Sequence, residues 1–138
     1  MRVFTIVQDA LCLEQEARVH DFGVNCIASI ELDDGKQILA TGGDDQHVNV
    51  MEWVEGELRV ATRWQAHSSC VKGVGLYDRA DKEVLVCSSG YDQRFKVWQT
   101  NGKPVRTQRH CLSDMNAMHL ANGKAHLVGQ GIFTIKLI

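Results

Sequence analysis

Short stretches in which apolar and polar residues alternate recur along most of the 138-residue chain. His47–Val54 shows this pattern well, because its apolar residues fall close to every second position. Such alternation is typical of β-strands with one buried and one exposed face. The Gly, Asn and Asp residues between these stretches predict tight turns. The predicted strands are Val24–Glu31, Gln37–Thr41, His47–Val54, Leu58–Trp64, Val71–Tyr77, Glu83–Ser88, Arg94–Gln99, Pro104–Cys111, Asp114–Leu120, Ala125–Gly129 and Ile132–Ile138.

The N-terminal region does not follow the pattern of the rest of the chain. Arg2–Val7 has the character of a strand, whereas Asp9–Arg18 has no counterpart further along. Two interpretations remain open for this region: the last strand of a preceding unit followed by a loop, or a short helix over Leu11–Arg18.

The chain contains an internal repeat with a period of 47 residues. Ala40–Val50 aligns without gaps on Cys87–Val97, and the same offset places His20 on His67. Two separate stretches that agree on one offset indicate a true repeat, in which each copy is one supersecondary unit of four short strands. A third copy, from Asp114 onward, is shorter.

Composition narrows the class of protein further. The chain is 44% apolar and 23% charged, which is typical of a folded domain. Its formal net charge of −2 provides no global electrostatic attraction to nucleic acid. The five scattered cysteines form no CxxC pair and are expected to be mostly small core residues in a reducing compartment. No signal peptide or membrane-spanning segment is evident, so we expect a cytoplasmic protein.

The second copy resembles a WD repeat. The resemblance rests on four residues, which are His67, Ser88, Asp92 and Trp98. In that family these positions form a hydrogen-bonded chain, in which the Asp accepts from the imidazole and the hydroxyl accepts from the indole N–H. The first copy keeps His20, Thr41 and Asp45, but has Met51 where the Trp would stand, and the third, with Gly129–Gly131, lacks the turn Asp.

The resemblance implies an all-β fold of antiparallel four-stranded blades of a WD-repeat β-propeller. About three blades are present, which is too few to close a ring, so the chain is expected to be a fragment of a longer propeller. The expected units are residues 1–19 as the N-terminal strand and loop of a preceding blade, 20–66 and 67–112 as WD repeats, and 113–138 as a truncated terminal blade.

Catalytic and metal-binding interpretations are weaker than this structural one. His67, Ser88 and Asp92 are the residue types of a hydrolase triad, but they stand at repeat-defined positions and lack a nucleophile elbow. His110 and Cys111 are adjacent, and no second pair has the spacing of metal ligands. We therefore expect no enzyme activity, no metal, no cofactor and no small-molecule substrate.

The C-terminal half also resembles the family of WD repeat-containing protein 6, the large partner of a tRNA 2′-O-ribose methyltransferase. The matching stretches are Ala66–Gly73, Ser89–Trp98, Asp114–Asn116 and Gly129–Gly131. The resemblance implies a non-catalytic subunit that helps the methyltransferase act on the wobble nucleotide of the anticodon, with the methyltransferase subunit and tRNA as partners. A generic WD-repeat scaffold for a ubiquitin ligase or a trafficking complex is the alternative.

Either function requires a partner-binding face. The expected face lies beside the turn Asp and at the start of the first strand of each repeat. Its candidate residues are Asn25, Asp44, Trp64, Lys72, Tyr91 and Arg94, with Lys96 as a further candidate.

Overall fold

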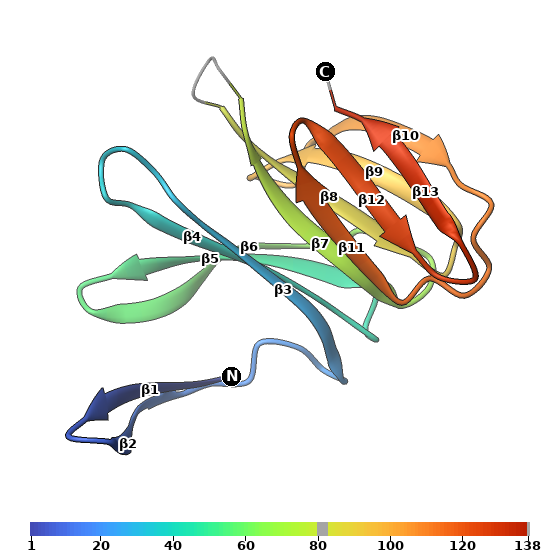
Figure 1. The fold of residues 1–138 in the computed structure, drawn as a ribbon. Coiled ribbons are helices and arrows are strands. Elements are labelled where there is room, and N and C mark those ends of the chain that lie inside the picture. The colour runs from blue at the N-terminus through green and yellow to red at the C-terminus, as the bar shows by residue number, and fades with distance from the viewer. Residues whose placement is uncertain (80–82, 138) are drawn as a thin grey trace.

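All regular secondary structure in the computed structural model, which describes residues 1–79 and 83–137, consists of β-strands. The strands form one two-stranded hairpin and three antiparallel sheets, arranged side by side in chain order (Figure 1). The sheets do not close into a ring. The predicted fold class of antiparallel propeller blades in an incomplete ring is thus confirmed.

Each sheet is a simple up-and-down meander. The first sheet contains β3 (Val24–Glu31), β4 (Gln37–Gly43), β5 (His47–Val54) and β6 (Glu57–Gln65). The second contains β7 (Val71–Asp78), β8 (Val84–Gly90), β9 (Arg94–Gln99) and β10 (Pro104–Arg109). The third has three strands, β11 (Ala117–Ala121), β12 (Lys124–Val128) and β13 (Ile132–Lys136).

Each predicted strand corresponds to one of these elements, although β4 and β8 continue two residues beyond the predicted ends at Thr41 and Ser88. The greatest difference lies where the second sheet leads into the third. The strand predicted over Pro104–Cys111 ends at Arg109, and the one predicted from Asp114 begins at Ala117. Between them, Leu112 and Met115 turn inward and are buried between the two sheets. The chain here crosses from the outer strand of one sheet to the first strand of the next, which interrupts the alternation. Ile138, the predicted end of the last strand, lies outside the described residues.

The N-terminal region is a β-hairpin of β1 (Arg2–Val7) and β2 (Ala10–Glu16). The helix considered for Leu11–Arg18 is wrong, and so is the expectation of a strand followed only by a loop. The Gln15 side chain holds β2 against the first sheet, donating to the Leu58 carbonyl at 2.7 Å and accepting from the Leu58 N–H at 2.9 Å. These tertiary bonds, together with pairing to β1, override the local helical preference.

The hydrophobic cores lie between the sheets. The first core joins the first and second sheets and includes Val50, Val86 and Trp98, while the second joins the second and third sheets around Phe95 and Leu127. Strand β7 contacts β3 and β4 on one side and β11 on the other. Each sheet is therefore held in place by its neighbour, as expected for repeat proteins.

The first two sheets repeat their irregularities as well as their strands. A β-bulge leaves Asn25 unpaired at the start of β3, and another leaves Lys72 unpaired at the start of β7, 47 residues later. Gln46 and Gln93, also 47 residues apart, both adopt left-handed backbone conformations in the turns after β4 and β8. Bulges and turns thus meet at the same end of each sheet, which we call the turn edge.

Candidate functional site

A buried hydrogen-bonded chain supports the turn edge of the second sheet. The His67 Nδ1 lies 2.9 and 3.0 Å from the two carboxylate oxygens of Asp92, and its Nε2 lies 2.8 Å from the Ser88 hydroxyl. The indole N–H of Trp98 donates to that same hydroxyl at 2.9 Å. Because the carboxylate only accepts, Nδ1 carries the imidazole hydrogen and Nε2 accepts from Ser88. The structure thus brings together the four residues that the sequence predicted to form this chain.

The first sheet contains a shorter version of the same arrangement. His20 Nδ1 lies 2.9 Å from Asp45, and His20 Nε2 lies 2.9 Å from the Thr41 hydroxyl. Met51 occupies the tryptophan position and is buried. A residue not predicted from the sequence, Asn49, places its amide nitrogen 3.1 Å from His20 Nε2. This amide is a second donor to the imidazole nitrogen.

The aspartates of both arrangements are held ionised. Burial tends to raise the pKa of Asp45, but hydrogen bonds from the Asp21 N–H and from His20 outweigh it, and the net pKa lies below its ordinary value. Burial likewise opposes ionisation of Asp92, and the bonds from His67 lower its pKa overall. Both carboxylates also accept from the backbone at the start of the next strand, which secures the left-handed turn.

Ser88 is completely buried, with 0% of its surface exposed. Its hydroxyl is also occupied by His67 and Trp98. A nucleophile must reach its substrate, so this His–Ser–Asp set fits a structural role and not the attack step of a hydrolase.

The third sheet lacks this arrangement, as its missing turn Asp predicts, and another buried histidine precedes it in the chain. His110, at the junction with the second sheet, is 3% exposed, and its Nε2 lies 3.0 Å from the hydroxyl of Ser89 in β8. Burial lowers the pKa of His110 below its ordinary value. His110 therefore fixes the segment after β10 to strand β8 of the same sheet.

Four candidate residues meet at the turn edge, where the first and second sheets adjoin. The Asn25 amide donates to Asp44 at 2.7 Å and to the Val71 carbonyl at 3.0 Å. The Lys72 ammonium lies 3.6 Å from Asp44 and 5.0 Å from the centre of the Tyr91 ring, an ion pair and a cation–π contact. We call Asn25, Asp44, Lys72 and Tyr91 the turn-edge cluster.

The geometry of the turn-edge cluster suits recognition of a macromolecule. Asp44 and Tyr91 remain 42% and 41% exposed. The bonds from Asn25 foremost, with those from Cys70 and Lys72, lower the pKa of Asp44, so the cluster presents a fixed carboxylate beside an ammonium and an aromatic ring. The β-bulges aim Asn25 and Lys72 at this edge, a frequent use of bulges at functional sites.

The other three candidates do not join the turn-edge cluster. Trp64 is partly buried and packs against the core between the sheets, with its ring 5.8 Å from that of Trp98. The Lys96 ammonium donates to the Ala66 carbonyl at 2.6 Å and lies over Trp98, so it too has a packing role. Arg94 is exposed at the start of β9, where its backbone N–H bonds Asp92.

Within residues 1–79 and 83–137, no three His, Cys, Asp or Glu side chains are grouped so that they could hold a metal ion. Over the same ranges, no helix has the length and apolar character needed to cross a membrane.

One charged region was missed by considering only the whole-chain charge. Residues 91–138 contain seven Lys or Arg and two Asp or Glu, whereas residues 1–90 contain eight and fifteen. The near-neutral total therefore conceals an acidic N-terminal part and a basic C-terminal part. Counting charge separately for each repeat would have found this asymmetry.

No protein-family model matches this chain, and no curated protein matches it either.

Proposed function

We propose that the chain is a non-catalytic WD-repeat module that helps a tRNA 2′-O-ribose methyltransferase act on the wobble nucleotide of the anticodon. The observation that carries the binding role is the turn-edge cluster, which is drawn from two sheets and fixed by bulges at equivalent positions. The buried imidazole–carboxylate pairs beneath it restrain the turns, so little conformational entropy is lost when a partner binds. The resemblance of the C-terminal half to the methyltransferase partner supplies the identity of the bound enzyme.

The composition of the turn-edge cluster supports docking of a protein surface. A cation stacked on a tyrosine and paired with a carboxylate offers both polar and aromatic contacts, and tyrosine is enriched at interfaces. In this proposal the cluster contacts the methyltransferase subunit, and tRNA is held by the complex.

A pull-down from cytosolic extract tests the proposal. The tagged chain serves as bait, bound proteins are identified by mass spectrometry, and bound RNA is sequenced. We expect an RNA ribose methyltransferase together with tRNA. Recovery of ubiquitin-ligase or coat subunits without tRNA would refute the tRNA assignment and favour the generic scaffold.

A double substitution in the turn-edge cluster tests whether recovery of the methyltransferase depends on that cluster. Lys72→Gln with Tyr91→Ala removes the cation and the ring, and should reduce methyltransferase recovery at least tenfold. Lys36→Gln with Val105→Ala is the matched control, because it changes an exposed cation and an exposed apolar side chain outside the cluster. Equal recovery with both variants would show that the enzyme docks elsewhere.

A further inference from the structure

The outward face of the third sheet departs from the pattern that the first two sheets share. Each of those sheets covers the face toward the next sheet with apolar residues, which form the two cores. Rows of paired residues are counted from the turn edge. The second row pairs Ala40 with Val50 in the first sheet and Cys87 with Val97 in the second. The third row pairs Ile38 with Glu52 and Leu85 with Gln99. In the second row, all four side chains are buried and apolar.

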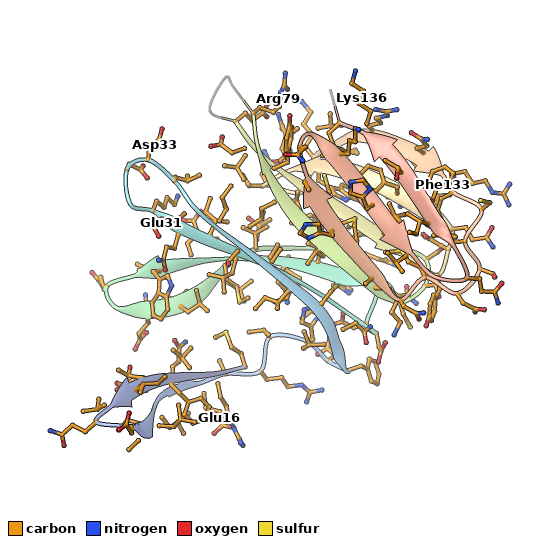
Figure 2. All side chains as sticks on the ribbon, in the orientation of Figure 1. Glu16, Glu31, Asp33, Arg79, Phe133 and Lys136 are labelled. Atoms are coloured by element: carbon orange, nitrogen blue, oxygen red, sulfur yellow. The ribbon has the colours of Figure 1, made fainter. Side chains whose placement is uncertain are left out.

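The corresponding rows of the third sheet are polar and charged. The second row pairs His126 with Thr134, whose hydroxyl lies 3.1 Å from His126 Nδ1, and the third pairs Lys124 with Lys136. On the neighbouring strand β11, His119 stands directly opposite His126. We call these five residues the lysine–histidine face. In Figure 1 the third sheet lies in front of the second, and Figure 2 shows Lys136 at the end of β13.

In these two rows the opposed lysines disfavour cover by another apolar sheet, whereas the first row of the same face, Val128 paired with Ile132, is apolar and exposed. Like charges directly opposite one another on paired strands are destabilising, and burial of two ammonium groups would add a large desolvation cost. Lys124 and Lys136 are both exposed. Within the described part of the chain, no carboxylate forms an ion pair with either one. A bound anion would relieve their repulsion.

The surroundings favour an extended anion. The region from residue 91 onward has a five-charge excess of Lys and Arg over Asp and Glu. This excess of positive charge favours a polyanion, because polyanions bind cationic regions through release of their counterions.

We propose that the lysine–histidine face binds the phosphate backbone of RNA. The two ammonium groups bind phosphate oxygens, and the imidazoles and the Thr134 hydroxyl provide additional hydrogen-bond donors. The choice of RNA over an acidic protein rests on the proposed function. The face lies on a different sheet from the turn-edge cluster, so enzyme and RNA would occupy separate surfaces.

Salt-dependent binding of labelled, unfractionated tRNA to the 138-residue chain tests this inference. Lys124→Gln with Lys136→Gln should weaken binding about tenfold at low salt. It should also reduce the steepness with which the logarithm of the association constant falls with the logarithm of the salt concentration. The expected reduction in this slope is about 1.5, because each lost phosphate contact lowers it by about 0.7–0.9. Lys36→Gln with Lys103→Gln removes the same net charge from exposed sites on other strands and turns, and should leave the slope within 0.5 of the wild type. Equal slopes for the two double variants would overturn the proposal, as would the absence of measurable tRNA binding by the wild-type chain.

The same variants separate this inference from the proposed function. If the Lys124→Gln, Lys136→Gln chain recovers the methyltransferase but loses tRNA binding, both proposals are supported. If it recovers the enzyme and binds tRNA like the wild type, the lysine–histidine face is overturned while the proposed function stands. If the wild type binds tRNA through this face but recovers no methyltransferase, the proposed function fails and the RNA-binding face is retained.

Discussion

Replacement of Ser88 by alanine should destabilise the chain more than loss of a single ordinary hydrogen bond. Its hydroxyl joins His67 Nε2 at 2.8 Å and the Trp98 N–H at 2.9 Å, in a position closed to water. Ser88→Ala leaves both polar groups buried without a partner. Each unsatisfied group costs about 1–3 kcal/mol, so we expect the free energy of unfolding to fall by about 2–4 kcal/mol.

Thr41→Val in the first sheet is the matched control. It replaces a hydroxyl by a methyl group of similar size, at the position equivalent to Ser88. The Thr41 hydroxyl bonds His20 Nε2, and the amide nitrogen of Asn49 lies 3.1 Å from the same atom. The imidazole nitrogen therefore keeps one donor, and the expected loss is about 1 kcal/mol.

Urea unfolding, followed by circular dichroism, measures both losses. The free energy of unfolding falls with urea concentration by about 1–3 kcal/mol/M, the m-value. At an unchanged m-value, a loss of about 3 kcal/mol therefore lowers the urea midpoint by about 1–3 M. Trp98→Phe should cost less in the Ser88→Ala background than in the wild type, because the indole N–H has already lost its partner. If Ser88→Ala costs no more than Thr41→Val, or if the two effects of Trp98→Phe are equal, the shared hydroxyl does not couple these groups.

Three other predictions concern packing, pH and thiol chemistry. Gly73→Ala places a Cβ 2.5 Å from a Met118 carbon and should cost about 1–3 kcal/mol in urea unfolding, whereas Gly131→Ala, with no atom within 4 Å, should be neutral. Burial lowers the pKa of His110, so the unfolded chain binds this proton more readily and the free energy of unfolding should fall as the pH drops below 6.5. His110→Gln should weaken the dependence of the urea midpoint on pH, measured from pH 8 to pH 5. Burial raises the pKa of the Cys87 thiol to about 12, so iodoacetamide at pH 8 should label exposed thiols first and Cys87 only after unfolding, and early labelling of Cys87 by mass spectrometry would contradict its burial.

The internal repeat made much of the fold accessible from the sequence. A fixed offset of 47 places equivalent side chains at equivalent points of successive sheets, so one motif predicted the partners of both His20 and His67. Alternation then fixed the strands because burial on one face of a sheet has a period of two. The placement of Asn25, Asp44 and Lys72 at one edge follows from the same offset.

Contacts between sheets could not be predicted in this way. Trp64 has the same local pattern whether it faces solvent or the ring of Trp98, and only the packing of the second sheet decides between them. The bond between His110 and Ser89 lies within one repeat, but the positions 47 residues earlier are Arg63 and Gly42, so the offset does not predict it.

The sequence by itself determined the strands and turns of the repeats, because these depend on residue type and on spacing within one repeat. Its resemblance to WD repeats implied the buried polar chains. Only the tertiary structure decided which faces are covered. It paired β2 with β1 in place of a helix, packed Trp64 against Trp98, and left Lys124 opposite Lys136 on an exposed sheet. The physical reason is that burial and electrostatic repulsion depend on distances between elements, and these distances are set only when the sheets pack together.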